Sequence, residues 1–280
     1  MNRDEYIKMV EVEDSMWHFR SLHRHVLREL LHALGHSPAK ILDAGCGTGG
    51  LIRRLVSEVP AWEWTGLDSQ PLACQLASER SGGAFVEGSV ESLPFADGTF
   101  DAVVSADVLC CVKDDNAALQ EVFRVLRPGG VMIVNVAVYP WLWSYHDEAT
   151  QTQRRYRAKE LTGKIRAAGF GEVASKRWNA LTLPLLALRR KILPPDQGGS
   201  DVRTYPVLIN KAMGAFMWVE HAWIGLGGRW PFGSSEMAVA GKPDGQATAA
   251  GPNVHRNGHH REEVLAPVHR VCRALDQPPE

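Results

Sequence analysis

The stretch that decides the fold is ILDAGCGTGG, residues 41 to 50, where an apolar run and one aspartate lead into four glycines within six positions. Glycine is costly to order, so this many side chains are absent only where something approaches the backbone closely. The run is typical of a strand end, and the following LIRRLVSEV is typical of a helix. A bare loop between a strand and a helix offers backbone amides to the polar part of a ligand. The sequence therefore predicts a ligand site at this loop.

Short strands continue to alternate with amphipathic helices from residue 39 to residue 178. After the first strand, the expected strands are WEWTGLDS, GAFVEGS, FDAVVSAD, VMIVNVAV and a segment near EVASKRW. The expected helices between them are PLACQLASER, NAALQEVFRVL and AKELTGKIRAAGF, and RPGG is expected to form the turn before VMIVNVAV. This alternation predicts an α/β fold with a mostly parallel sheet and crossover helices.

The flanking regions have different compositions and suggest further divisions of the chain. Residues 1–38 contain a helix-forming stretch over 16–34, and residues 235–242 offer one last strand. Between them and outside the core, residues 179–234 are rich in tryptophan and glycine and too apolar for an exposed loop. We expect this insertion to cover the binding site of a substrate, with a homodimer interface as the alternative. Residues 243–280 have a linker-like composition and are expected to form a mobile tail.

Composition narrows the classes of partner. The chain has 280 residues, of which 45% are hydrophobic and 22% charged, with a net charge of −1, so a nucleic-acid partner is not expected. The charged N-terminus lacks the apolar core of a signal peptide, which favours the cytoplasm. The most apolar run, ALTLPLLAL, is too short to span a membrane, although the RRK after it leaves a membrane-surface helix as a minor alternative. The five cysteines have no metal-type spacing, and no metal is expected.

Two cofactor classes fit the glycine loop. Gly45, Gly47 and Gly50 satisfy G-x-G-x-x-G, and Asp68 follows at the distance of a ribose-binding acid, which permits NAD. The same stretch also reads D-x-G-x-G-x-G from Asp43. An acid at the strand tip sits badly beside a pyrophosphate but suits a cofactor that carries an ammonium group.

Three blocks in order resemble the class I S-adenosylmethionine (SAM)-dependent methyltransferases: LDAGCGTGG, GSVESLPFADGTFDAVVSADVL and EVFRVLRPGGVMIV. The resemblance implies a Rossmann-like, seven-stranded, mostly parallel sheet with flanking helices, a helical cap insertion before the last strand, and SAM as cofactor. The last strand, here SSEMAVAGKP, runs antiparallel in that family. The flanks VEVEDSMWHFRSLHR and YPWLWSYHDEATQTQRRYRAKEL resemble a bacterial subgroup acting on small molecules, and within it the indole C3-methyltransferases of natural-product pathways.

The resemblance also implies a set of cofactor-binding residues. Asp43 and the amides of the loop hold the methionine portion, Asp68 accepts from the ribose hydroxyls, and Ala106 lies near the sulfonium. The full set is Asp43, Gly45, Cys46, Gly47, Gly49, Asp68, Ser69, Gln70, Ser89, Val90, Glu91 and Ala106. The chain departs from the family pattern at Ser89, where an acid is common, and at Cys110-Cys111, where Glu-His is common.

The segment after the fifth strand, YPWLWSYHDE, is expected to face the reactive methyl group. His146 is the first candidate base and Tyr145 the second, because methyl transfer leaves a proton to remove. The aromatic residues expected to enclose the acceptor are Trp17, Phe19, Trp141, Trp143, Tyr156 and Trp178. We therefore expect methyl transfer from SAM to a small aromatic acceptor, in the narrower form C3-methylation of an indole. An O- or N-methyltransferase is the nearest alternative, and an NAD-dependent reductase or a non-catalytic binding module are alternatives of another class.

Overall fold

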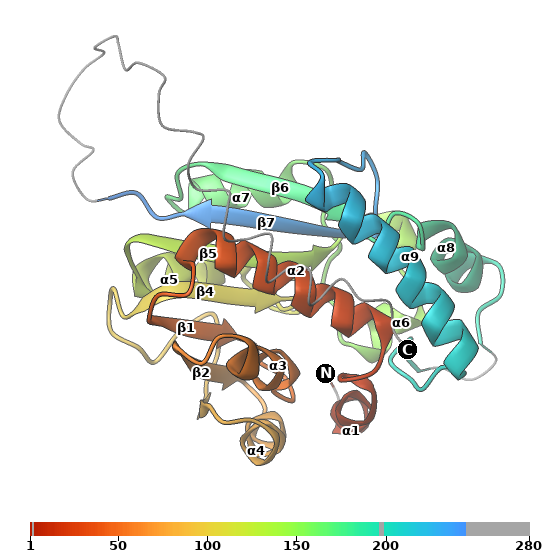
Figure 1. Cartoon of the computed structure of the whole chain (residues 1–280), viewed down its shortest axis with the longest axis horizontal. Helices are drawn as coiled ribbons and strands as arrows, with labels where there is room; N and C mark the ends of the chain where they lie inside the picture. The colour runs from red at the N-terminus through yellow and green to blue at the C-terminus, as the bar shows by residue number, and fades with distance from the viewer. Residues whose placement is uncertain (2, 196–198, 245–280) are drawn as a thin grey trace, which may run out of the picture.

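The computed structural model describes residues 1, 3–195 and 199–244. In these residues seven strands form one sheet in the order β3-β2-β1-β4-β5-β7-β6 (Figure 1). The strands are β1 Ala39–Ala44, β2 Trp62–Asp68, β3 Ala84–Glu87, β4 Phe100–Ala106, β5 Leu126–Ala137, β6 Val173–Trp178 and β7 Ser235–Gly241. The first five strands run parallel to one another, whereas β7 pairs antiparallel with both β5 and β6. The predicted fold is confirmed, including its antiparallel last strand.

Helices cover both faces of the sheet. The helices are α1 Arg3–Val12, α2 Trp17–Leu34, α3 Gly50–Glu58, α4 Pro71–Arg80, α5 Asp115–Val125, α6 Tyr145–Ala149, α7 Glu160–Ala167, α8 Leu183–Lys191 and α9 Val207–Gly225, with a short 3-10 helix η1 Pro140–Leu142. One core cluster joins α2, α3 and α9 to the sheet, and a second joins α5 and α7 to its other face. The central strands are buried on both faces, which explains why their sequences are continuous apolar runs.

The RPGG segment differs from its prediction as a turn that precedes the strand. Strand β5 already begins at Leu126, which pairs with Phe100, and pairing resumes with Val131 opposite Ala102. The four residues between them form a bulge, and Gly129 takes a left-handed φ of 74° there. The glycines therefore interrupt the strand locally and do not delay its start.

The two flanking regions meet at one end of the sheet. Helix α9, from the apolar insertion, packs against α2, from the N-terminal region (Figure 1). Helix α1 leads into α2 and contacts α4, beside the glycine loop. No helix within the described residues combines the length and apolar composition needed to cross a bilayer. The expected tail beyond residue 244 lies outside the described residues.

Candidate functional site

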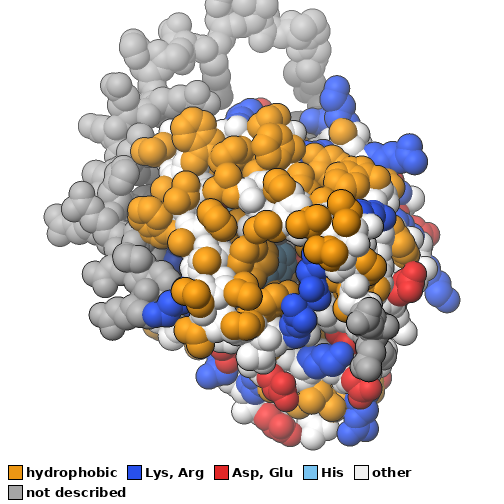
Figure 2. Space-filling view, turned by 90° about the vertical axis from the view of Figure 1, so that its right-hand side faces the viewer, with side chains coloured by type: hydrophobic (Ala, Val, Ile, Leu, Met, Phe, Trp, Pro, Cys, Tyr) orange, Lys and Arg blue, Asp and Glu red, His pale blue; other side chains and the backbone are white. Residues whose placement is uncertain are grey.

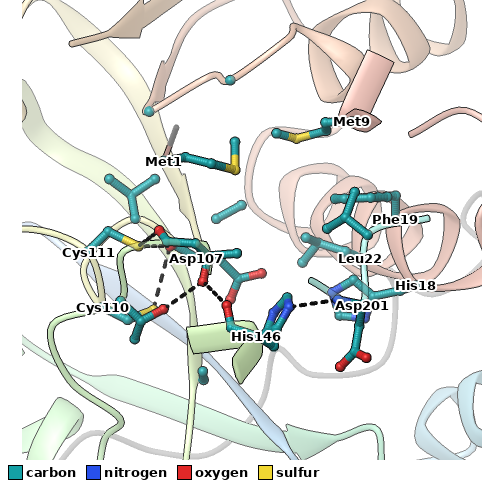
Figure 3. A pocket seen from close by; sticks show the side chains of 18 of the residues that line it. Met1, Met9, His18, Phe19, Leu22, Asp107, Cys110, Cys111, His146 and Asp201 are labelled. Atoms are coloured by element: carbon teal, nitrogen blue, oxygen red, sulfur yellow. Dashed lines mark hydrogen bonds between the residues drawn. The ribbon is translucent and has the colours of Figure 1, made fainter. Parts of the chain in front are cut away.

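A cavity of about 1110 Å³ lies at the carboxyl ends of β1, β2 and β4. It extends from the glycine loop to α8 and α9, and α1 and α2 also contribute to its wall (Figure 3). Sites for small molecules usually measure a few hundred to a thousand Å³. This cavity therefore has room for a cofactor and a second small molecule together.

The glycine loop forms one end of the cavity. Gly45 and Gly47 line it with left-handed φ angles of 96° and 54°. A Cβ on Gly45 would overlap Val108, whereas Gly47 has space in front of it, since the nearest side-chain atom to an added Cβ belongs to Met9. Gly49 is outside the cavity lining, because it packs against α4, where its Cβ would meet Ala77. Two of the predicted glycines thus line the cavity, and the third allows close helix packing.

Two buried acids stand beside this loop. Asp43 ends β1, and its burial, with the nearby Glu13 and Asp68 carboxylates, raises the pKa of Asp43 to about 8. Asp68 ends β2, where its carboxylate accepts hydrogen bonds from the Tyr6 hydroxyl (3.2 Å) and the Gly47 N–H (3.0 Å). A pKa of about 8 leaves Asp43 mostly protonated at neutral pH, and a cationic ligand beside it would favour the ionised form. The end of the cavity at the glycine loop is therefore acidic and suits a cofactor with positive charge.

The residues predicted to meet adenine lie together at the edge of the same cavity. They are Ser69, Gln70, Ser89, Val90 and Glu91. The Ser89 hydroxyl accepts a hydrogen bond from the Glu91 N–H at 3.1 Å, so it holds the turn as well as facing the cavity. Cys46 and Ala106 also line the cavity.

Helix α1 and Glu13, the residue after it, supply a part of this site that the sequence did not reveal. Tyr6, Met9 and Glu13 all line the cavity near the loop. The Glu13 carboxylate accepts hydrogen bonds from the Thr48 hydroxyl and, at 3.0 Å, from Arg80. It also fills the space in front of Gly50, where a Cβ would overlap it. The charged N-terminal sequence is typical of a solvated helix, and only the missing side chain at position 50 hinted at a close neighbour.

Asp107 is the second residue that sequence reasoning missed. It follows β4 with a left-handed φ of 60°, an uncommon conformation for a residue other than glycine, and it lines the cavity beside Ala106. The Trp178 indole N–H donates to Asn135 Oδ1 at 2.7 Å, and Asn135 Nδ2 donates to Asp107 Oδ1 at 2.8 Å. Because the Trp178 indole can only donate, these two hydrogen bonds fix the orientation of the Asn135 amide and direct its N–H to the Asp107 carboxylate.

Burial raises the pKa of Asp107 to about 6, opposed by the Asn135 hydrogen bond and by Arg155. A carboxylate with such a pKa is still ionised at neutral pH and is more basic than an ordinary aspartate. In Figure 3, Asp107 lies between the cysteine pair and His146, facing the residues of α1 and α2 across the cavity. The signal in the sequence was only an acid at the end of a strand.

His146, the first candidate base, lies at the acceptor end of the cavity (Figure 3). Its Nδ1 accepts a hydrogen bond from the Asp201 N–H at 3.1 Å, so the neutral ring carries its proton on Nε2. Burial, with a smaller contribution from Arg190, lowers the pKa of His146 to about 3. In this arrangement the ring offers a neutral N–H donor. Tyr145 is outside the cavity lining, and its hydroxyl donates to the Asp201 carboxylate at 2.7 Å.

The predicted aromatic wall forms only in part. Trp17 and Phe19 line the cavity from α2. The other four predicted residues lie outside its lining: Trp141, Trp143, Tyr156 and Trp178. Trp141 is 53% exposed, and Trp143 accepts a hydrogen bond from Lys191 through its carbonyl.

Tyr156 and Trp178 are fully buried for reasons of packing. The Tyr156 hydroxyl donates to Asp115 at 2.6 Å on the α5 and α7 side of the sheet. Trp178 stacks on His18, which does line the cavity, with ring centroids 5.4 Å apart. Tyr156 therefore belongs to the core, and Trp178 supports the site from behind.

Charged side chains replace the expected aromatic residues at the acceptor end. Arg189 and Arg190 share one carboxylate, that of Asp201, with nitrogen–oxygen distances of 3.0 and 2.8 Å. Arg155 and Asp147 form a separate buried pair at 2.7 Å. These five side chains carry three positive charges and two negative charges. With the nearby Asp107 carboxylate the positive and negative charges of this end balance, so it is less acidic than the end at the glycine loop.

Residues 42–134 match a family model described as a methyltransferase domain. The chain is 36% identical over 107 residues to demethylmenaquinone methyltransferase of Deinococcus radiodurans, covering 36% of this chain and 44% of the relative. It is 33% identical over 141 residues to 2-methyl-6-phytyl-1,4-hydroquinone methyltransferase 2 of Oryza sativa subsp. japonica, covering 49% and 40%. The chain thus spans less than half the length of these relatives.

Among solved structures, phosphoethanolamine N-methyltransferase 2 of Haemonchus contortus in complex with S-adenosyl-L-methionine shares the fold, with a TM-score of 0.55 and 17% identity. That match covers 79% of this chain and 53% of the other. The matched model and the relatives identify a methyltransferase domain over residues 42–134, and the solved structure shares the fold of the chain.

Proposed function

We propose that this chain transfers a methyl group from SAM to a small, mainly apolar acceptor that contains a ring and an oxygen substituent. The main support for this proposal is that a single cavity joins the glycine loop and its acids to Asp107 and His146. Asp43 and Asp68 fit the positive charge of SAM, and Gly47 leaves space for its approach. The names of the two sequence relatives, a demethylmenaquinone and a hydroquinone methyltransferase, support this acceptor class.

The chemistry requires two things of the protein, once SAM supplies a methyl group already activated by its sulfonium. The acceptor must be held in line with that group, and a proton must leave the acceptor. Asp107 is placed for the proton, because its carboxylate lines the cavity and is more basic than usual. His146 Nε2–H is placed to donate to an acceptor oxygen. Phe19 and Leu22 supply apolar walls that exclude water.

The acceptor atom defines narrower candidates. C3-methylation of an indole is the candidate that the flanking segments suggest, and Asp107 would then take the proton from the ring. O- or N-methylation of another small molecule uses the same base. The N–H donor of His146 favours an oxygen-bearing ring over an unsubstituted indole.

A screen with isotopically methyl-labelled SAM tests the proposal. The acceptors are hydroquinones and naphthoquinols with and without isoprenoid tails, phenols, amines and indoles. We expect label transfer to oxygen-bearing rings, with product analysis giving the methylated atom. Label transfer confined to unsubstituted indoles would overturn the acceptor class. No transfer to any class, together with tight SAM binding, would favour a binding module, and tight binding of NAD would favour a reductase.

A further inference from the structure

The end of the molecule that carries α8 and α9 exposes many large apolar side chains. We call residues 185–193 and 203–232 of this end the cap face. Val207, Leu208 and Leu226 are 72%, 80% and 86% exposed. Ile192, Leu193 and Trp223 add to the same surface. In Figure 2 hydrophobic side chains cover most of the view of this end of the molecule. Contiguous apolar surface of this kind marks an interaction site.

Helix α9 explains why the apolar surface remains. One side of it is buried, at Met217, Glu220, His221 and Ile224, and the helix packs on α2. Apolar residues continue on its other sides, where no described element covers them. A helix that is apolar beyond its packed side requires a further apolar environment.

The charges of the cap face are of one sign. Among the described residues 181–195 and 199–232, the two acidic side chains, Asp201 and Glu220, are both buried. The exposed charged residues there are basic: Lys191, Arg203, Lys211 and Arg229. A second copy of the chain would bring these like charges together across a two-fold interface. An anionic bilayer offers both an apolar interior and an opposite charge.

The cavity opens within the cap face. Leu185, Ile209 and Met213 line the cavity and belong to the same helices as the exposed apolar residues. Figure 2 shows a hollow surrounded by hydrophobic side chains, with basic side chains beside it. A surface that covered this face would therefore lie directly at the cavity mouth.

We propose that the cap face binds the surface of an anionic membrane, with the apolar side chains of α8 and α9 inserted among the lipids and the basic residues at the headgroups. An apolar acceptor dissolved in the bilayer would then reach the cavity without crossing water. This route for the acceptor rests on the proposed function, whereas membrane binding itself does not.

Sedimentation of the full chain with lipid vesicles tests the proposal without any turnover. We expect binding to vesicles of phosphatidylcholine with phosphatidylglycerol, weaker binding to phosphatidylcholine alone, and release of part of the bound protein by high salt. Absence of binding to the anionic vesicles at low salt would overturn the proposal, whatever the acceptor screen shows. Activity on a soluble acceptor without vesicle binding would reject the membrane site and leave the proposed function standing.

Matched variants locate the binding surface. The double variant Arg203→Gln/Arg229→Gln should lower the partition coefficient on anionic vesicles about thirtyfold, which corresponds to about 1 kcal/mol for each basic side chain. The control Arg157→Gln/Arg166→Gln removes the same charge near and on α7 and should bind as the unmodified chain does. Leu208→Gln/Leu226→Gln should weaken binding to both vesicle types by about tenfold or more, because both leucines lose their apolar insertion.

Two further outcomes of these experiments would overturn the proposal that the cap face binds membranes. Equal losses in the two arginine pairs would show a general charge effect and reject the cap face as the site. Conversion of a dimer to a monomer by Leu208→Gln/Leu226→Gln, without vesicle binding in either form, would assign the face to self-association and overturn the proposal. Circular dichroism checks that the variants, all at exposed positions, keep the fold.

Discussion

The two halves of the cavity are built in different ways. The cofactor half uses strand ends, backbone amides and acids, of which Asp43 and Asp68 are the closest to the glycine loop. The acceptor half uses side chains of α2, α6, α8 and α9, where histidines stand beside arginines that are paired with aspartates. All histidines of the described chain lie outside residues 37–145, which hold the glycine loop and strands β1 to β5. One half therefore binds mainly through backbone geometry, and the other through particular side chains.

This difference predicts that acid opens the acceptor half first, with the largest effect that we expect. Burial lowers the pKa of five histidines from 6.5: His18 to about 4, His23, His146 and His221 to about 3, and His25 well below its usual value. The unfolded chain then binds protons before the folded chain does. Stability is full above pH 6.5 and falls as the pH drops towards these lower values, by up to about 1.4 kcal/mol per pH unit for each histidine.

Hydrogen exchange at pH 7 and at about pH 5.5, corrected for intrinsic rates, measures this loss region by region. Peptides of α2 and α9 should lose protection, whereas β1 and β2 should retain it. His221→Gln should recover part of the loss, and His36→Gln, at an exposed position, should recover none. Uniform loss across both halves would contradict the comparison.

The same contrast explains what could be predicted from the sequence. The glycines and the strands that end at Asp68 and Ala106 have sequences that dictate backbone conformation, so the strands and the loop could be predicted from them. The predicted cofactor residues other than Gly49 line the cavity. The identity of an aromatic residue does not indicate whether it faces the cavity or the core. Tyr156 and Trp178, which we expected in the cavity wall, are buried in the core. The hydrogen bond from Asn135 to Asp107 joins residues 28 positions apart, so the proposed role of Asp107 as a base could not be predicted from the local sequence.

The contributions of α1 and of the cap depend on contacts between distant segments. Glu13 meets Thr48 across 35 positions, and Asp201 meets His146 across 55. Neither pair has a spacing that local periodicity could reveal. The sequence thus indicated the residues of the proposed cofactor half, but not the groups at the acceptor end.

Replacement of the proposed base should produce the next largest effect. Asp107→Asn keeps an oxygen that can accept from Asn135, so the fold should survive. Turnover on the identified acceptor should fall by roughly 10³-fold, within the range for loss of a general base. SAM affinity, measured by calorimetry, should change little. In the unmodified chain kcat/KM should decline about tenfold per pH unit below the Asp107 pKa of about 6, and this limb should vanish in the variant.

Asp101→Asn is the matched control, because it changes an acid at the opposite end of β4. Turnover near that of the unmodified chain in Asp107→Asn would remove Asp107 as the base. His146→Ala separates the two candidates. A moderate rise in KM with little change in the pH profile would fit a donor, whereas loss of the acidic limb would restore His146 as the base.

The cofactor half should respond to loss of its ribose acid. Asp68→Ala removes the acceptor for two hydroxyls of SAM, and we expect about a thirtyfold loss of SAM affinity, or about 2 kcal/mol. Glu63→Ala, an exposed acid on the same strand, is the control. Calorimetry should show the loss for SAM and no binding of NAD to either protein. Unchanged SAM affinity in Asp68→Ala would place the ribose elsewhere.

The smallest expected effect concerns the boundary between the two halves. Cys111 lines the cavity beside Asp107, where its thiol lies 3.6 Å from the Asp107 carbonyl (Figure 3). A hydrogen bond from Cys110 lowers the pKa of Cys111, which favours the reactive thiolate. SAM bound at the loop should slow alkylation of Cys111 by iodoacetamide roughly fivefold, through occupation of the cavity. Cys74 is outside the cavity lining and serves as the internal control, with both thiols followed by mass spectrometry of their peptides. Protection of Cys74 alone would show that SAM acts on α4 and leaves the cavity open at Asp107, so the two halves would not share one reaction space.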